Sequence, residues 1–302
     1  MLLLLALGCA TPPESPDAPY DETAMMADVT YLASPELDGR APGSAGDSSA
    51  RAMVSERFAA LGLIEPEEFG DYEQPFTDAQ GNETANVIGY LPGTDDALAS
   101  DLVVVSAHLD HFGDGLLGAN DNASGVSGLL SIAQALAEQG AARTVVFAAF
   151  GAEESGFEGS NHFYTDPPSD LDPADFVYNV NLDMIGSYDS TSTVFALGTM
   201  SGTPARAAVD EITAEYPHLD VGVGEASDES DNFEFCSRGV PYVFMWTEDL
   251  DCYHETCDTA DRIDSENMAL IAKFTGDLVT VLADTSDDLR AGVQAGTDVC
   301  GM

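Results

Sequence analysis

Residues 102–110 read LVVVSAHLD, a continuous apolar run that ends in a histidine and an aspartate. Such runs are typical of strands that are covered on both faces, as in parallel sheets. The runs TVVFAAF at 144–150 and FVYNVNL at 176–182 have the same character, and a helical apolar spacing over 123–138 lies between the first two. Strands that alternate with helices predict an α/β fold with a largely parallel central sheet.

The flanking sequence extends the same alternation in both directions. Ser44 is the expected N-cap of one helix and Gly62 its expected stop signal. Further helices are predicted at 23–33, 47–60, 204–215 and 266–283, and further strands at 85–91, 193–197 and 241–246.

The first ten residues, MLLLLALGCA, resemble an export signal, and the Pro- and Ser-rich stretch after them resembles a tether. The apolar run is too short to cross a bilayer as a helix. Cys9 either becomes a lipidated N-terminus or belongs to a plain secretory signal. We therefore expect an exported protein, secreted or held at the cell envelope as a lipoprotein, with residues 1–19 as signal and tether and 20–302 as one catalytic domain.

The charge of the chain is strongly one-sided, because 54 acidic residues face nine basic ones and the net charge is −45. A basic nucleic-acid-binding surface is therefore excluded. The acidic balance favours a protein adapted to high salt, where mutual repulsion is screened, over an ordinary acidic extracellular protein.

The chain has five cysteines, and four remain if Cys9 belongs to the signal. An even set in an oxidising compartment indicates disulfides. Cys252 and Cys257 flank His254, so they either form a disulfide that closes its loop or bind a metal with it; export favours the disulfide. Whether the other two cysteines pair is left open.

Polar residues stand where predicted strands end. His108 and Asp110 follow the first run, Glu153 and Glu154 the second, and Asp183 the third. Ligands of open α/β sheets bind beyond the carboxyl ends of the strands, so these side chains are expected to meet. Two further candidates are Asp121, in ANDNASG before a helix, and His254, in CYHETCDT.

Each of these residues also has an ordinary structural interpretation, such as a helix cap for Asp121 or a solvated loop for Glu153 and Glu154. Taken together, two histidines and three carboxylates satisfy two zinc ions that share one carboxylate and keep open positions for water. Two such ions can hold a hydroxide between them and polarise a carbonyl group. The set therefore predicts a hydrolytic site with two zinc ions.

The ordered motifs H-x-D, DNASG, EESG, NLDMIG and YHxxxDT resemble the co-catalytic di-zinc aminopeptidase family, with YLASPELDGRAPGS, FAALGL and NVIGYLPG upstream. That family includes glutamate carboxypeptidases, glutaminyl cyclases and the transferrin receptor. The resemblance covers about residues 26–282. It implies a three-layer α/β/α sandwich with a mixed, mostly parallel sheet, and peptides as substrates.

The resemblance also implies a role for each ligand. His108 and Asp183 would bind one zinc ion, Glu154 and His254 the other, and Asp121 both.

Three further roles follow from the resemblance. Asp110 would orient the ring of His108, Glu153 would be the general base, and Tyr253 would stabilise the oxyanion. Cys252 and Cys257 would form a disulfide. Asn232 departs from the pattern, because family members often have histidine there, which puts substrate contacts rather than metal ligands in question.

An aminopeptidase is the favoured activity. A carboxypeptidase or dipeptidase of the same fold is the main alternative, and a glutaminyl cyclase or an inactive binding protein are weaker ones. Recognition of an α-carboxylate would need a basic residue, for which Arg206, Arg238 and Arg262 are candidates. The sequence sets no oligomeric state. Apolar candidates for the substrate pocket are Phe233, Phe235, Met245 and Trp246.

Overall fold

The side chains of strand β3 (Leu102–His108) alternate between two hydrophobic cores. Val103 and Val105 belong to one core, and Leu102 and Val104 belong to the other. Every residue of the strand is buried. The strand is therefore covered on both faces, as its uninterrupted apolar run predicts.

A computed structural model describes residues 11–13, 16, 18–199, 203–224, 227–249, 251–291 and 300. The expected signal and Cys9 lie outside the described residues. None of the helices in the described part of the chain is long and apolar enough to cross a membrane.

The strands form one eight-stranded sheet in the order β1-β2-β4-β3-β5-β8-β6-β7. The four central strands β4, β3, β5 and β8 are parallel to one another, whereas β1, β2 and β6 introduce antiparallel pairs. The sheet is therefore mixed, as expected. The other strands are β1 (Glu73–Thr77), β2 (Glu83–Leu91), β4 (Thr144–Phe150), β5 (Phe176–Leu182), β6 (Val194–Leu197), β7 (Val221–Gly224) and β8 (Tyr242–Trp246).

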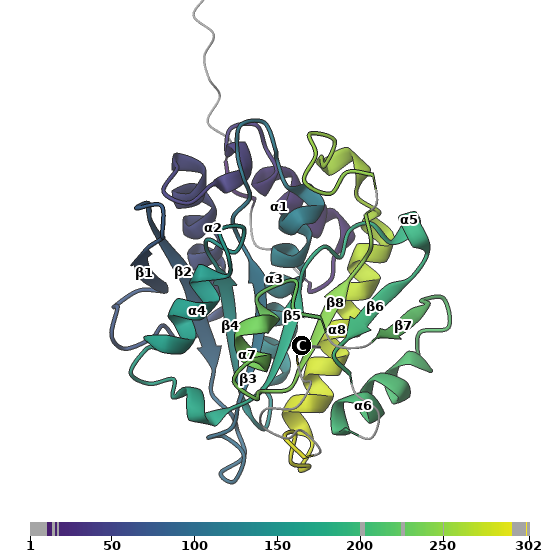
Figure 1. Cartoon of the computed structure of the whole chain (residues 1–302). Helices are drawn as coiled ribbons and strands as arrows, with labels where there is room; N and C mark the ends of the chain where they lie inside the picture. The colour runs from purple at the N-terminus through teal and green to yellow at the C-terminus, as the bar shows by residue number, and fades with distance from the viewer. Residues whose placement is uncertain are drawn as a thin grey trace, which may run out of the picture.

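Helices cover both faces of the sheet and complete the expected three layers (Figure 1). The larger core lies under α1, α2, α3, α6 and α8, and the smaller core lies under α4 and α7. The helices are α1 (Glu22–Leu32), α2 (Ala45–Leu61), α3 (Gly125–Gln139), α4 (Glu158–Thr165), α5 (Tyr188–Thr191), α6 (Pro204–Thr213), α7 (Asn232–Cys236) and α8 (Ser265–Asp284), with short helical turns at Asp38–Arg40, Ala119–Ser124, Pro173–Asp175 and Ala260–Arg262.

The boundaries of α2 follow from its sequence. The hydroxyl of Ser44 accepts a hydrogen bond from the N–H of Asp47 (3.0 Å), as an N-cap does. Gly62 ends the helix in the left-handed conformation, at φ 73°, which glycine adopts without a steric penalty. Both expected signals are confirmed.

Five short elements have no counterpart among the sequence-based expectations: the strands β1 and β7 and the helices α4, α5 and α7. Strand β7 reads VGVG and lies at the sheet edge, where only one neighbouring strand stabilises it. Helix α7 has five residues, too few to show a helical period.

Candidate metal centre

The carboxyl ends of three parallel strands bring the predicted residues to one edge of the sheet. His108 is the last residue of β3, Glu153 and Glu154 follow β4, and Asp183 follows β5. Because β3 lies between β4 and β5, His108 is the middle of this row. The parallel sheet thus places residues that are far apart in sequence beside each other.

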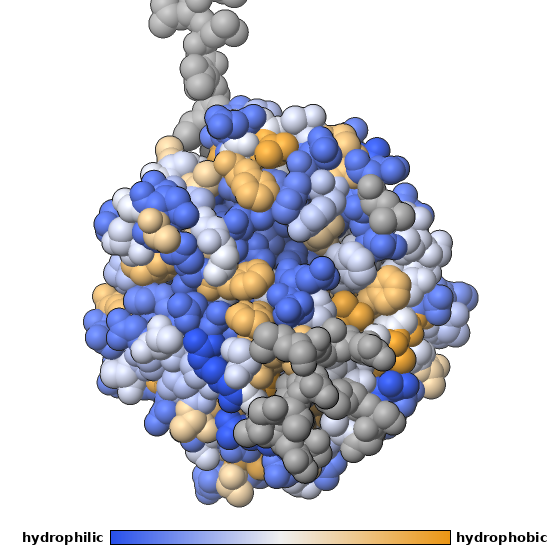
Figure 2. Space-filling model, viewed as in Figure 1, coloured by the Kyte–Doolittle hydropathy of each residue, from blue (hydrophilic) through white to orange (hydrophobic). Residues whose placement is uncertain are grey.

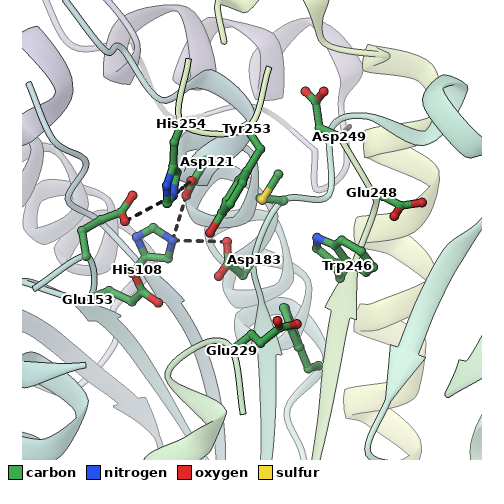
Figure 3. A pocket seen from close by; sticks show the side chains of 13 residues that line it. His108, Asp121, Glu153, Asp183, Glu229, Trp246, Glu248, Asp249, Tyr253 and His254 are labelled. Atoms are coloured by element: carbon green, nitrogen blue, oxygen red, sulfur yellow. Dashed lines mark hydrogen bonds and ion pairs between the residues drawn. The ribbon is translucent and has the colours of Figure 1, made fainter. Parts of the chain in front are cut away.

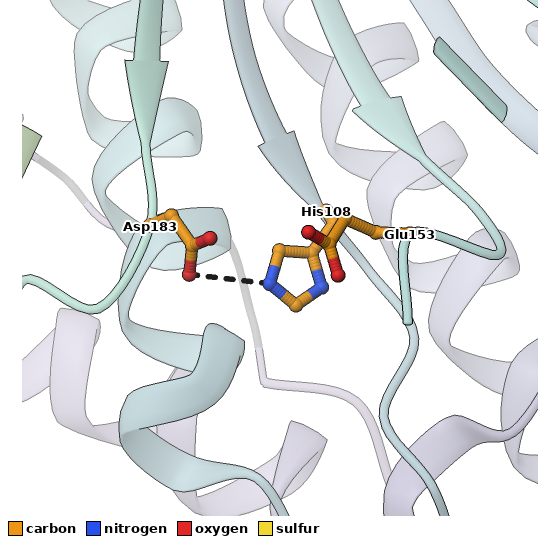
Figure 4. Close-up of side chains that lie close together, drawn as sticks. All are labelled: His108, Glu153 and Asp183. Atoms are coloured by element: carbon orange, nitrogen blue, oxygen red, sulfur yellow. Dashed lines mark hydrogen bonds and ion pairs between the residues drawn. The ribbon is translucent and has the colours of Figure 1, made fainter. Parts of the chain in front are cut away.

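His108 meets carboxylates on more than one side. Its Nε2 lies 3.2 Å from Oδ1 of Asp183 and 3.2 Å from Oδ1 of Asp121. His108, Glu153 and Asp183 each offer one ligand atom within 4.8 Å of the others, a spacing that a metal ion can bridge (Figure 4). Glu153, the expected base, therefore also lies within reach of this group.

A second group lies on the other side of Asp121. Nε2 of His254 lies 3.1 Å from Oδ2 of Asp121 and 3.4 Å from Oε2 of Glu154. Nδ1 of His111 lies 2.6 Å from Oε1 of Glu154. One oxygen of Asp121 therefore faces each group, which is the arrangement of a shared ligand.

Asp121 is held in a buried segment rather than acting as a helix cap. The capping role falls to Asn122, whose Oδ1 accepts from the N–H groups of Gly125 (2.9 Å) and Met184 (3.1 Å). Its Nδ2 donates to the carbonyl oxygen of Leu182 (2.9 Å). Asn122 thus joins the Asp121 segment to the end of β5 and leaves the Asp121 carboxylate free to face the histidines.

The position of Asp110 differs in detail from the expectation. Nδ1 of His108 lies 3.1 Å from the main-chain oxygen of Asp110, but 3.9 Å from its carboxylate, beyond hydrogen-bond distance. The carboxylate instead accepts from the N–H groups of Glu153 (2.9 Å) and Glu154 (3.3 Å). Asp110 therefore fixes the ring of His108 through its main chain and the two glutamates through its side chain.

The loop that carries His254 is closed by a disulfide between Cys252 and Cys257. These sulfurs are therefore not metal ligands. The ring of Tyr253 stacks on that of His254, with centroids 3.7 Å apart, and its hydroxyl end points into the pocket (Figure 3). A second disulfide joins Cys236 to Cys300, the pairing that the sequence left open.

Three buried residues at the site carry no role in the sequence-based interpretation. His111 follows Asp110 directly in the run H-x-D-H, and its Nδ1 lies 2.6 Å from Glu154. Asp231 is fully buried, and neither of its oxygens has a hydrogen-bond donor among the described residues. Asp258 accepts from the main-chain N–H groups of Asn120 and Asp121. No spacing signal marks Asp231, because its surroundings come from other strands.

Burial and mutual repulsion set the protonation of the site in the absence of metal. Burial, with the charge of Asp121, raises the pKa of Glu154 to about 9, and burial raises that of Glu153 well above its usual range. Burial opposes protonation of His108, but Asp183 and Glu153 raise its pKa well above the ordinary value. So many buried carboxylates are stable together only with protons or cations among them.

The site opens into a cavity of about 400 Å³ (Figure 3). Beyond the candidate ligands, its wall combines apolar and acidic side chains and contains no lysine or arginine among the described residues. Figure 2 shows that the surface around it is mostly hydrophilic, with scattered apolar side chains. The wall residues besides the ligands are Glu153, Met184, Glu229, Phe244, Trp246, Glu248, Asp249 and Tyr253.

Of the apolar pocket candidates, only Trp246 lines the cavity. Phe235 and Met245 are fully buried in the cores, and Phe233 packs against Phe157. Asn232 does not line the cavity either; its Nδ2 donates to the main-chain oxygen of Ser227.

None of the three candidate arginines lines the cavity. Arg206 pairs with Asp210, and Arg238 pairs with Glu234. The described wall of the cavity therefore has no guanidinium group for an α-carboxylate.

The sequence is similar to those of known peptidases. Residues 86–279 match the profile of peptidase family M28. The chain is 32% identical over 194 residues to Aminopeptidase YwaD of Bacillus subtilis, covering 60% of this chain and 40% of that protein. It is 30% identical over 232 residues to an aminopeptidase of Pseudomonas aeruginosa, covering 65% and 42%. The chain thus spans about two fifths of the length of these curated relatives.

The fold is similar to that of solved aminopeptidase structures. A zinc aminopeptidase from Bacillus subtilis superposes with a TM-score of 0.74 at 16% identity, covering 92% of this chain and 99% of that one. At this identity the likeness concerns the fold. The profile match covers more than half of the chain and includes the ends of β3, β4 and β5 with the residues that follow them. The resemblance read from the five ordered motifs is thereby confirmed, and this chain belongs to peptidase family M28.

Proposed function

We propose that the chain is an exported zinc metallopeptidase that removes N-terminal residues from peptides. The observation that carries the proposal is the position of Asp121 between two histidines in the lining of one cavity: its Oδ1 lies 3.2 Å from Nε2 of His108, and its Oδ2 lies 3.1 Å from Nε2 of His254. A carboxylate in this position can offer one oxygen to each ion of a two-metal hydrolytic site.

The residues present fit two zinc ions. Imidazole nitrogen and carboxylate oxygen are both zinc ligands, and the mixture of the two is typical of catalytic sites. In this assignment His108 and Asp183 would hold one ion, Glu154 and His254 the other, and Asp121 both. His111 lies near enough to Glu154 to orient it or to complete the second group. Cobalt or manganese would suit the same ligands.

When bound, zinc would lower the pKa of a water molecule and polarise the carbonyl group of the scissile bond. Glu153, at the edge of the first group, would accept a proton from the attacking water at its carboxylate and deliver it to the leaving amine. The hydroxyl of Tyr253 would donate a hydrogen bond to the developing oxyanion. Asp110 would hold Glu153 in place through the main-chain N–H.

The wall of the cavity favours an aminopeptidase over a carboxypeptidase. A free α-amine is positively charged, and the wall offers it acidic side chains, Glu229 among them. An α-carboxylate would meet those same carboxylates without a lysine or arginine in the described wall. A glutaminyl cyclase or an inactive binding protein is less favoured, because the expected base and all five ligands are present.

Export is supported by the disulfides. Cys236 pairs with Cys300 and Cys252 pairs with Cys257. Disulfides persist in oxidising compartments and are rare in the cytosol. A secreted protein and an envelope lipoprotein are both consistent with this pairing.

The test is an assay of purified protein with its bound metal quantified. Leucyl and N-acetyl-leucyl chromogenic amides are compared for the wild type, Glu153→Gln and the control Glu56→Gln, which changes an exposed residue of α2. We expect about two zinc ions per chain, cleavage of the free-amine substrate alone, and a loss of about 10²–10⁴ in kcat for Glu153→Gln only. Zinc without cleavage of either substrate would direct the search to carboxypeptidase substrates, and a chain that binds no zinc would disprove the proposal.

A further inference from the structure

The turn Asp38–Arg40, which belongs to the upstream stretch YLASPELDGRAPGS, has no part in the function proposed above. It lies between α1 and α2, far from the metal ligands in sequence. Yet the side chain of Arg40 is 0% exposed. A buried guanidinium is rare unless its five N–H donors are satisfied, so its partners indicate what it does.

All hydrogen bonds of the Arg40 side chain go to main-chain oxygens. Its Nε donates to the oxygen of Leu109 (2.7 Å), its Nη1 to those of Leu117 (2.8 Å) and Leu32 (2.6 Å), and its Nη2 to that of Gly118 (3.0 Å). Among the described residues it has no carboxylate within ion-pair distance. One side chain therefore joins three segments of the chain.

Two of those segments carry metal ligands. Leu109 lies between His108 and Asp110 in the sequence, and Gly118 lies shortly before Asp121. Arg40 thus joins the end of β3 to the segment that presents the shared carboxylate. A displacement of either segment would move a ligand away from the histidine that it faces.

The other two residues of the turn, Asp38 and Gly39, contact the loop at residues 113–118. Oδ1 of Asp38 accepts from the N–H of Gly115 (2.9 Å). A Cβ on Gly39 would stand 2.3 Å from the main-chain oxygen of Leu116, and Gly39 has a φ of 75°, so only glycine fits there. Main-chain and side-chain contacts of the turn therefore converge on residues 113–118.

The positive charge of Arg40 interacts with the carboxylates of the same ligand group. Burial lowers the pKa of Arg40 to about 10, and the carboxylates of Asp110, Asp258, Asp121 and Glu154 favour its charged form. It is therefore a cation at neutral pH. A fixed cation behind a group of buried carboxylates lessens their repulsion, most of all before any metal is bound.

We propose that Arg40 is a positioning residue that preorganises both zinc-ligand segments, so that its loss weakens zinc binding by more than its loss of stability accounts for. The inference rests on the proposed function for the identity of the metal. Its alternative is a purely structural arginine that stabilises the fold without affecting the ligands.

The chain contains a matched control for that alternative. Arg143 is also buried, at 2% exposure, and its guanidinium donates to the main-chain oxygens of Leu282, Thr285 and Asp287. Unlike Arg40, it also pairs with a carboxylate, that of Asp101 (3.2 Å). It lies next to the start of β4, at the opposite end of the strand from the ligands. A substitution there removes a similar set of bonds without touching a ligand segment.

The experiment compares the full-length chain with Arg40→Met, Arg40→Lys, Arg143→Met and Arg143→Lys. Zinc dissociation constants are measured on metal-free protein by competition with a chelating indicator, together with unfolding midpoints. We expect all four variants to be less stable. Only the Arg40 variants should bind zinc about 10–100-fold more weakly, as substitutions of residues that orient ligands do. Lysine keeps the charge, but its single ammonium group cannot contact all four carbonyl groups. Arg40→Lys should therefore bind zinc more tightly than Arg40→Met and more weakly than the wild type.

Asp38→Gly is the variant for the case in which neither Arg40 variant folds. The position is exposed, glycine accepts its positive φ of 43°, and the substitution removes only the acceptor for Gly115. We expect a smaller loss of zinc affinity in the same direction. Wild-type affinity in the Arg40 variants that fold, or in Asp38→Gly if none does, would overturn the inference while leaving the proposed function intact. A wild type that binds no zinc would overturn both, and zinc binding without peptidase activity would overturn the proposed function alone.

Discussion

The carboxylate of Asp258 accepts a hydrogen bond from the main-chain N–H of Asp121 at 3.0 Å, and its second oxygen accepts from the N–H of Asn120 at 2.7 Å. The residue after the His254 loop thus holds the segment that carries the shared ligand. Arg40 binds the carbonyl groups at one end of this segment, and Asp258 binds the N–H groups at the other.

Asp258→Asn should lower zinc affinity and activity together. The amide keeps one acceptor, but its NH₂ group must face an N–H donor that is then left unsatisfied, which costs about 1–3 kcal/mol. We expect roughly a tenfold fall in kcat/KM and weaker zinc binding, measured by titration of the metal-free protein. Asp261→Asn is the control, because Asp261 is exposed and its side chain accepts, within the described part of the chain, only from Thr259. Equal effects of the two substitutions would contradict the role given to Asp258.

One disulfide should matter more for thermal stability and the other more for activity. Cys236–Cys300 spans 64 residues and Cys252–Cys257 spans five, so in the chain-entropy account the first stabilises the fold more. We expect the double serine variant at 236 and 300 to lose more thermal stability than the double serine variant at 252 and 257. The double variant at 252 and 257 should lose the more activity, because it frees the loop of His254. Calorimetry and initial rates on the same preparations check both expectations.

An acidic cavity wall should favour N-terminal residues with a positive side chain. Glu248 lines the cavity beside Trp246, and its carboxylate has no hydrogen bond or ion pair among the described residues. A lysyl stem can pack on the indole while its ammonium group meets Glu248. Glu248→Gln should lower kcat/KM for lysyl relative to leucyl amides by roughly fivefold, the effect of about 1 kcal/mol. An unchanged ratio, with Glu56→Gln as control, would exclude Glu248 from substrate selection.

Asp231 should make the metal-free protein less stable as the pH rises. Burial raises the pKa of Asp231 from 3.8 to about 7. The folded state therefore prefers the protonated carboxyl, and this stabilising contribution is complete below pH 3.8 and is lost as the pH rises through 7. Asp231→Asn is neutral at every pH. In urea titrations, the free energy of unfolding of the wild type should fall relative to that of the variant, by a few kcal/mol between pH 5 and pH 8.

Salt should stabilise the protein, because 54 acidic residues face nine basic ones. Their repulsion is screened over about 3 Å at 1 M salt and about 30 Å at 0.01 M. We expect Tm to rise by several degrees from 0.05 to 2 M KCl, and to rise less in sorbitol of matched osmolality. A Tm that does not change with KCl would argue against adaptation to high salt.

The sequence predicts the parts of this molecule whose signals are local. The buried runs that became β3, β4 and β5 are long and apolar, and the polar residues after them fall where parallel strands end, so the ligands could be predicted together. The signals for β1 and β7 are weak because edge strands are stabilised by one neighbour and bury little. Helix α7 is too short for periodicity.

Other features depend on the tertiary structure. The bonds from Arg40 to Leu109 and Gly118 cross about 70 residues of chain and involve only main-chain acceptors, which carry no residue preference. Asp231 is buried near Ser160, His108 and Asp183, which come from distant parts of the chain. The carboxylate of Asp110 turns to the main chain of Glu153, because that N–H lies within hydrogen-bond distance. Motif spacing cannot reveal contacts of this kind.

The ligands of the site come from the ends of three strands and from two loops, and His254 enters the chain after β8 has completed the parallel part of the sheet. A partly synthesised chain that ends before His254 therefore lacks one of the five proposed ligands, however well its first strands have paired. An unfolded chain lacks both, because no two of the strand ends are neighbours in sequence. In the peptidase proposed here, hydrolytic activity would therefore require a chain that has been synthesised past His254 and has folded.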